Sequence, residues 1–284
     1  MIVLEVKNLK TYFSVPDGIV KVVDGVSFNI EKGKVFGIVG ESGSGKTITA
    51  LSVLKLISWP GSIVGGSVIF NPSALRQTQG RPEQCRSTAG SGVNGLDLLK
   101  LGEKDLRSIR GSRISIVFQE PASSFNPVFT IGEQIVETII NHQRVDGDKA
   151  KNIALEYLNK VHIDEEDRIF HGYPHQLSGG TKQRAMIAMA LVNSPELVIL
   201  DEPTTALDVT IQAQILDLLK EIIEKEKLSI IFISHDFGIV SRMCDRVAVM
   251  HKGGIVETGD TKQVLDDPKN EYTVSLLESV RMLA

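Results

Sequence analysis

The chain lacks several features that would place it in a protein class. Its 284 residues include only two cysteines, Cys85 and Cys244, too few for a disulfide framework or a four-cysteine metal cluster. No apolar run approaches the ~20 residues of a membrane-spanning helix, and the start, Met1–Glu5, lacks the basic region and apolar core of a signal peptide. We therefore expect no segment of the chain to span a bilayer.

The charge balance argues against a nucleic-acid-binding protein. Lys and Arg number 31 against 35 Asp and Glu, so the formal charge is −4, and no long basic stripe offers nucleic acid a footprint. We expect no nucleic-acid partner. The length is sufficient for one large core or for two compact lobes.

A glycine-rich loop is the most informative stretch that is present. It fits the pattern G-x-x-x-x-G-K-[ST], follows the apolar run Val35–Val39 and precedes a predicted helix, Thr47–Leu56. Glycines let a backbone fold around a polyphosphate and turn its N–H groups inward, and the helix start adds partial positive charge. Lys46 can reach the β- and γ-phosphates, and the Thr47 hydroxyl can hold Mg²⁺. The loop, formed by Gly40, Glu41, Ser42, Gly43, Ser44, Gly45, Lys46 and Thr47, therefore predicts binding of a nucleoside triphosphate.

Hydrolysis would need a second group of residues, and Leu197–Glu202 supplies it. Four apolar residues that read as a buried parallel strand end in Asp201 and Glu202. Asp201 can hold the Mg²⁺ shell, and Glu202 can polarise the attacking water. Acids also end buried strands for solubility or helix capping, so this motif becomes strong only beside the glycine-rich loop.

A third motif is Leu177, Ser178, Gly179 and Gly180, which precedes a helical stretch and so lies at a helix N-terminus suited to an anion. With these residues the chain resembles the ATP-binding cassette (ABC) superfamily, and most closely the ATPase subunits of oligopeptide and dipeptide importers. The resemblance runs through nearly the whole chain. Its further segments are Val23–Phe28, Ser124–Gly132, Tyr173–Gly180 and Asp201–Asp208.

The resemblance implies roles for further residues. Gln119 matches the glutamine that contacts Mg²⁺ and senses the membrane partner, and His235 matches the switch histidine that contacts the γ-phosphate. Asp208 matches the dimer-facing aspartate. Adenine should stack on an aromatic ring near the N-terminus, for which Phe13 falls on the family position and Tyr12 is the alternative.

The chain departs from the family pattern at two places. Thr181 and Lys182 replace the Met-Arg or Gln-Arg pair that usually follows the signature, and Glu120 stands where Asp is usual. The phosphate-facing Ser178 and Gly180 are unchanged, so we expect tuning of activity and no loss.

The fold class that follows is α/β, a P-loop NTPase of ABC type. It has a mainly parallel sheet core, an N-terminal antiparallel β-subdomain and a helical signature subdomain. We expect residues 1–118 and 185–260 to form the ATPase core with its antiparallel β-subdomain and 119–184 the helical subdomain. Residues 261–284 would form a short C-terminal helical extension, which looks abbreviated beside relatives.

The resemblance implies an ATPase that uses ATP and Mg²⁺ to energise peptide uptake. Its partners would be a second ATPase subunit, two membrane-spanning permease subunits and, indirectly, an extracytoplasmic solute-binding protein. The chain would be peripheral, on the cytoplasmic face of the membrane. The phosphate-loop neighbourhood, Gly40–Ala50 with Leu51, resembles that of the first of two paralogous ATPases in such systems, so the resemblance implies a heterodimer in preference to a homodimer. A nickel or other solute importer is the alternative within transport. A soluble ABC ATPase acting on DNA or ribosomes is disfavoured, because no second cassette, coiled-coil insertion or zinc cysteines are visible.

One region does not fit the family. Pro72–Asn94 is rich in Gln, Arg, Ser and Gly and has little apolar periodicity, so it reads as an inserted flexible loop that contains Cys85. Its removal joins Ser67–Asn71 to Gly95–Leu99 and restores an Asn-Gly turn between two strands. A tolerated passenger loop and a partner-binding element are both compatible with this composition.

Deletion of residues 72–94 should preserve folding and ATPase activity, because Asn71 and Gly95 then form a favourable turn. The free energy of unfolding should rise by about 1–2 kcal/mol through a lower cost of loop closure. Thermal melting and ATPase rate of the intact and shortened chains measure both effects. Loss of folding would show that the segment packs into the sheet, and loss of transport alone would identify a partner-binding element.

Overall fold

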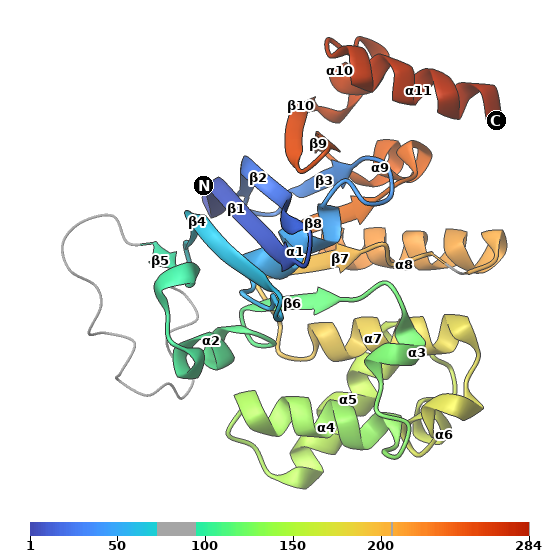
Figure 1. The fold of residues 1–284 in the computed structure, drawn as a ribbon. Coiled ribbons are helices and arrows are strands. Elements are labelled where there is room, and N and C mark those ends of the chain that lie inside the picture. Colours follow the sequence, from blue (N-terminus) through green and yellow to red (C-terminus); the bar gives the residue numbers. More distant parts are fainter. Residues whose placement is uncertain (73–94, 206, 284) are drawn as a thin grey trace. The chain divides into compact units, whose positions relative to one another are not determined.

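A computed structural model describes residues 1–72, 95–205 and 207–283 (Figure 1). The described chain forms two compact units. One consists of Met1–Pro72 with residues 95–106 and 229–283, and the other of residues 107–205 and 207–228. The segment boundaries expected from the sequence stay a prediction.

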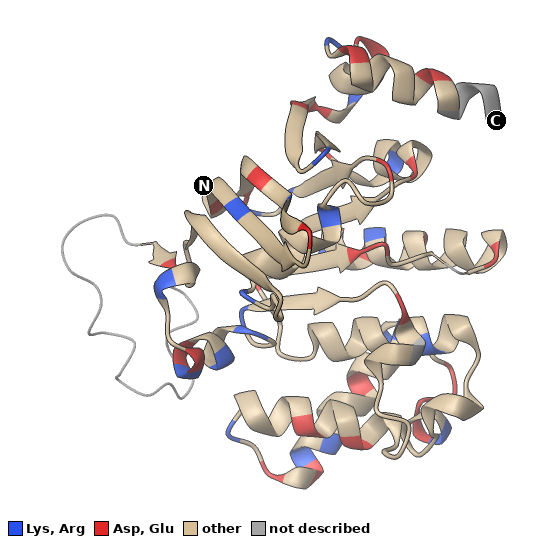
Figure 2. Cartoon of the chain, viewed as in Figure 1, with Lys and Arg blue, Asp and Glu red and all other residues tan. Residues whose placement is uncertain are grey.

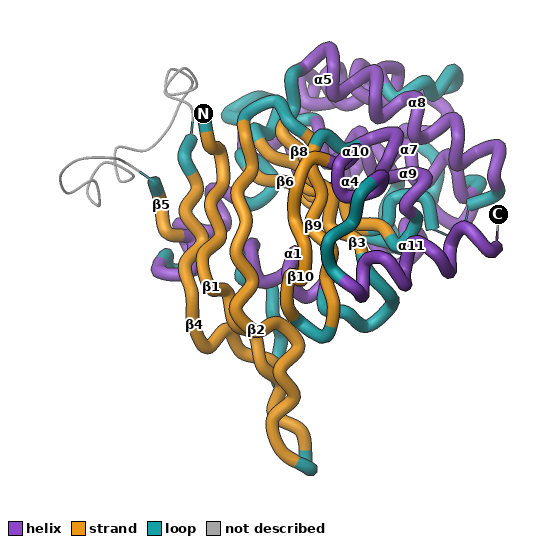
Figure 3. Tube along the Cα trace, turned by 90° about the horizontal axis from the view of Figure 1, so that it is seen from above, coloured by secondary structure: helices purple, strands orange, loops and turns teal. Residues whose placement is uncertain are grey.

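The first unit contains an antiparallel sheet with strand order β2-β1-β4-β5 (Figure 3). Its strands are β1 (Ile2–Val15), β2 (Gly18–Glu31), β4 (Gly61–Phe70) and β5 (Leu96–Asp97). Alternate residues of β2, namely Val26, Phe28 and Ile30, are buried, as a strand with one face on the core requires. This sheet is the antiparallel β-subdomain that the sequence predicts.

The predicted hairpin between β4 and β5 is confirmed, because Ile69 pairs with Asp97 and Phe70 with Leu96 in antiparallel register. The second strand is shorter than expected. The Asp97 side chain accepts a hydrogen bond from the Leu99 backbone N–H, which starts a 3₁₀ turn over Leu98–Lys100 and ends the strand. Helix α2 (Glu103–Ile109) follows. Residues 73–94, which hold nearly all of the predicted insertion, lie outside the described residues.

A mainly parallel sheet is the other layer of this unit. Strand β3 (Val35–Val39) pairs in parallel with β8 (Ser229–Ser234) and with β9 (Arg246–His251), and β10 (Gly254–Asp260) pairs antiparallel with β9. All residues of β3 and β8 are buried, which explains their continuous apolar sequence. Cys244 is buried at the same layer, and burial raises the pKa of its thiol.

Four helices accompany these strands: α1 (Lys46–Val53), α9 (Phe237–Met243), α10 (Thr261–Asp266) and α11 (Glu271–Leu283). Helix α1 ends earlier than the predicted Leu56, because Lys55 takes a left-handed conformation with φ of 53°. Helices α10 and α11 lie in the C-terminal segment for which the sequence predicts a helical extension.

The second unit has two parallel strands, β6 (Ile114–Val117) and β7 (Leu197–Asp201). Its helices are α3 (Pro121–Ser124), α4 (Ile131–His142), α5 (Gly147–Lys160), α6 (Glu166–Phe170), α7 (Gly179–Leu191) and α8 (Val209–Glu226), with a 3₁₀ turn at Pro174–Gln176. Helix α4 begins in a capping box between Thr130 and Glu133 and packs on α5 and α6. Acidic and basic residues are interspersed along these helices (Figure 2).

Among the described residues, we find no helix with the length and apolar character that crossing a membrane requires.

Candidate functional site

The glycine-rich loop joins β3 to α1 in the first unit and is packed directly on backbone. A Cβ atom on Gly40 would lie 2.2 Å from the Met250 carbonyl oxygen, and one on Gly45 would lie 2.5 Å from the Val22 carbonyl oxygen. Gly45 also has φ of 104° and caps α1. Only glycine fits these positions, so the sequence pattern reflects a real steric constraint.

Polar groups of the loop are arranged for an anion. The Lys46 side chain is 5 % exposed, and its ammonium donates to the carbonyl oxygens of Gly40 and Glu41 at 2.8 Å each. Ser44 Oγ is buried and has no hydrogen-bond partner among the residues that the structure describes. A phosphate oxygen would accept a hydrogen bond from this hydroxyl and lie near the Lys46 ammonium, and Thr47 is exposed in the first turn of α1. The loop therefore fits the polyphosphate that the sequence predicts.

His235 belongs to the same edge of the parallel sheet. Val39 and Ser234 are paired at the ends of β3 and β8, so the residues that follow them, Gly40 and His235, leave the sheet side by side. Asp236 fixes the turn after His235, because its carboxylate accepts hydrogen bonds from the backbone of Gly238 and Ile239 at 2.7 and 3.2 Å. The first unit thus places His235 beside Gly40, where the phosphate loop begins, and its role as a switch histidine stays a prediction.

The two adenine candidates have different surroundings. The Tyr12 hydroxyl donates to Asp24 at 2.8 Å, and this bond raises the pKa of Tyr12. The Phe13 ring lies on Gly61, where an added Cβ would meet it at 2.7 Å. Tyr12 is engaged in a polar pair and Phe13 packs on Gly61, and the assignment of the adenine-stacking ring stays a prediction.

The second unit brings Gln119 and Glu202 together. Val117 pairs with Leu200, and beyond these paired strand residues Gln119 Nε2 donates to Glu202 Oε2 at 3.1 Å. The Thr205 hydroxyl donates to the same oxygen at 2.8 Å. Glu202 has φ of 46°, an uncommon conformation for a non-glycine residue, whereas Asp201 is 2 % exposed at the strand end. The sequence-based prediction did not include Thr205, although a hydroxyl residue so soon after Glu202 indicates a possible hydrogen bond to its carboxylate.

The signature residues lie at the start of α7. Ser178 caps the helix by accepting a hydrogen bond from the Thr181 N–H at 3.2 Å, and its hydroxyl is 2.8 Å from that of Thr181. Ser178 and Gly179 are exposed, Leu177 is partly exposed, and a Cβ on Gly180 would meet Ile211 at 2.8 Å. The unusual Thr181 therefore contacts the signature serine directly.

Asp208 has a local structural task. Its carboxylate caps α8 by accepting a hydrogen bond from the Ile211 N–H at 3.0 Å, and the residue is exposed. This contact explains an aspartate here without a partner chain, and the dimer-facing role stays a prediction.

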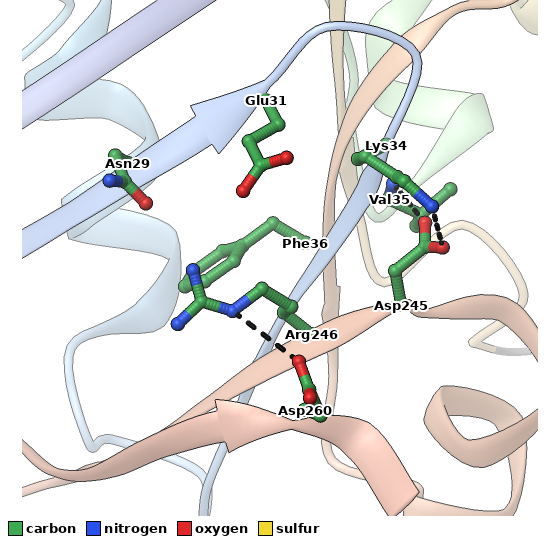
Figure 4. Close-up of a pocket in the computed structure, with 8 residues that line it drawn as sticks. All are labelled: Asn29, Glu31, Lys34, Val35, Phe36, Asp245, Arg246 and Asp260. Carbon is green, nitrogen blue, oxygen red and sulfur yellow. Dashed lines mark hydrogen bonds and ion pairs between the residues drawn. The ribbon is translucent and has the colours of Figure 1, made fainter. Parts of the chain in front are cut away.

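A separate hollow of about 260 Å³ lies at the opposite end of β3 from the phosphate loop (Figure 4). Two ion pairs line it: Lys34 contacts Asp245 at 2.8 Å and Arg246 lies 3.9 Å from Asp260. The hydrogen bond to Asp245 raises the pKa of Lys34. Because β3 separates this hollow from the loop, it is not the polyphosphate site.

Comparison with known proteins extends these observations. The family described as ABC transporter matches residues 23–205. Oligopeptide transport ATP-binding protein OppD of Bacillus subtilis (strain 168) is 43 % identical, over 99 % of this chain and 72 % of its own. Dipeptide transport ATP-binding protein DppD of the same organism is 41 % identical, over 99 % and 77 %. The ATP-binding cassette MJ0796, solved as a dimer bound to ADP and Pi, is 25 % identical, with a TM-score of 0.74 over 91 % of this chain and 98 % of its own.

Substitution of Gly45 by alanine tests the steric constraint in the loop. The new Cβ would lie 2.5 Å from the Val22 carbonyl oxygen at φ of 104°. We expect the free energy of unfolding to fall by about 2–4 kcal/mol from overpacking and left-handed strain. Affinity for a fluorescent ATP analogue should fall about tenfold or more, since the cradle must shift.

Gly43→Ala is the matched control for stability. Gly43 has φ of 79° but nothing within 4 Å of an added Cβ, so only left-handed strain of about 1–2 kcal/mol should result. Urea unfolding of the two variants separates the effects. Equal losses of stability would show that close packing of Gly45 does not constrain the loop.

Proposed function

Because the chain belongs to the ABC transporter family, we propose that it is the ATP-binding and ATP-hydrolysing subunit of an importer of oligopeptides or dipeptides. The observation that carries the proposal is the phosphate loop, in which Lys46 is buried and its ammonium donates to the carbonyl oxygens of Gly40 and Glu41. The peptide cargo is supported by relatives with oligopeptide or dipeptide transport names that align with 99 % of the chain.

ATP binding uses the loop's own donors. The Lys46 ammonium exchanges the carbonyl oxygens of Gly40 and Glu41 for β- and γ-phosphate oxygens, and Ser44 Oγ gains an acceptor. Thr47, Gln119 and Asp201 would hold Mg²⁺, which prefers oxygen ligands and neutralises charge on the phosphates. The adenine ring stacks on Phe13.

Hydrolysis uses the carboxylate of Glu202. It accepts a proton from water as the water oxygen attacks the γ-phosphorus, the bond to ADP breaks, and ADP and phosphate leave. The hydrogen bonds from Gln119 and Thr205 orient this carboxylate. His235 contacts the γ-phosphate and so senses its presence.

Two ATPase subunits act as a pair in this proposal. Leu177, Ser178, Gly179 and Gly180 of one subunit contact the ATP of the other, and Asp208 lies at the dimer face. The pair drives two membrane-spanning permease subunits from the cytoplasmic face of the membrane, with a solute-binding protein delivering peptide. ABC cassettes work as dimers, as in MJ0796, whose structure is dimeric.

The substitution Glu202→Gln tests the chemistry. The amide cannot accept the proton from water, so turnover should fall about 100-fold or more while ATP still binds. Lys46→Ala is the contrasting variant, because it should weaken nucleotide binding itself. ATPase rate and nucleotide affinity are measured on the assembled transporter. Turnover at the wild-type rate in Glu202→Gln would remove Glu202 from this role.

The substitution Ser178→Arg tests the shared site. A long cation in place of the exposed signature serine should abolish ATP-driven pairing between two such subunits. A Ser178→Arg subunit paired with a Lys46→Ala subunit should retain at most one competent site. The two substitutions damage the two halves of the same composite site and leave the other site intact. Light scattering and ATPase rate report the two effects. Unchanged pairing and turnover in Ser178→Arg alone would contradict the model.

A further inference from the structure

The phosphate loop is backed by the end of β9 and by the turn that leads to β10. The Gly253 N–H donates to the Ser44 carbonyl oxygen at 3.0 Å. Met250, near the end of β9, contacts the loop so closely that a Cβ on Gly40 would lie 2.2 Å from its carbonyl oxygen. The position of the loop therefore depends on the position of this turn.

A residue of the C-terminal helix packs on the same turn. Tyr272, at the start of α11, stacks on His251, with ring centroids 3.8 Å apart and an interplanar angle of 33°. Its hydroxyl oxygen is buried, and burial raises the pKa of the phenol. Tyr272 thus lies against the last residue of β9, next to the turn that backs the loop.

The sheet holds Tyr272 in this place. Glu257 on β10 accepts hydrogen bonds from the backbone N–H groups of Lys269 and Asn270 at 2.8 and 3.1 Å. The Asn270 side chain in turn accepts from the Tyr272 N–H at 2.9 Å. Helix α11 contacts β10. The start of the helix is therefore tied to the strand that continues from the turn.

We propose that Tyr272 is a positioning residue for ATP, which holds the phosphate loop in its binding conformation through its ring contact with His251 and the turn behind the loop. The inference rests on the proposed binding of ATP at this loop. A loop that is ordered before the nucleotide arrives has less conformational entropy to lose on binding. Loss of the ring would let the loop populate other conformations, and the apparent affinity would fall by the fraction of time spent in them. Helix α11 thereby sets ATP affinity without touching the chemistry.

The test uses the full chain with Tyr272→Ala and Tyr272→Phe, titrated with a fluorescent ATP analogue and Mg²⁺. Tyr272→Ala removes the stacked ring, and its affinity should fall about fivefold. Tyr272→Phe keeps the ring and should stay within about twofold of the parent chain. In the assembled transporter, Tyr272→Ala should raise KM for ATP at nearly constant kcat. Hydrogen exchange of the amides of residues 40–46 without nucleotide should quicken in Tyr272→Ala only.

Val264→Ala is the control for general loosening, because Val264 is 1 % exposed in α10 and its removal destabilises the same unit. Its ATP affinity should be unchanged. An affinity loss in Val264→Ala equal to that in Tyr272→Ala, or no loss in Tyr272→Ala, overturns the positioning role. Lys46→Ala separates the two levels of inference: if it still binds ATP normally, the proposed function itself fails. If Lys46→Ala loses binding and Tyr272→Ala does not, only the role of Tyr272 fails.

Discussion

Close packing of the phosphate loop on neighbouring backbone is the constraint on which the nucleotide site depends. Gly40 touches the Met250 carbonyl and Gly45 touches the Val22 carbonyl, at distances that leave no room for a side chain. Because these contacts join the loop to β9 and β2, the cradle takes its shape from two strands distant in sequence. A binding loop held this way is organised before its ligand arrives, which lowers the entropic cost of binding.

The carboxylate site in the second unit relies on a different device. Glu202 leaves its strand in a left-handed conformation, and side-chain hydrogen bonds from Gln119 and Thr205 converge on one of its oxygens. Strain of this kind costs about 1–3 kcal/mol and persists where surrounding contacts determine it. A carboxylate that polarises water must be held in a fixed orientation, and these hydrogen bonds hold Glu202 in that way.

The parts of the fold predicted well are those with local signals. The apolar run of β7 indicated a buried parallel strand, and the residues flanking the atypical segment indicated the hairpin of β4 and β5. The end of that hairpin was missed, because Asp97 captures a backbone N–H and turns the chain where propensity favours a strand. The early end of α1 at Lys55 likewise depends on one backbone conformation that no periodicity reveals.

The sequence by itself determined the class of the protein and the residues of its phosphate, carboxylate and signature motifs. Each motif is a short run whose chemistry depends on neighbours along the chain. Only the tertiary structure decided which groups hold these motifs in place: Thr205 on Glu202, Thr181 on Ser178, and Tyr272 with His251 behind the phosphate loop. It also showed that the two adenine candidates have different surroundings, because Tyr12 is paired with Asp24 and Phe13 packs on Gly61. Such contacts depend on strand register, cap geometry and close approach of backbone, which residue spacing in a single sequence does not encode.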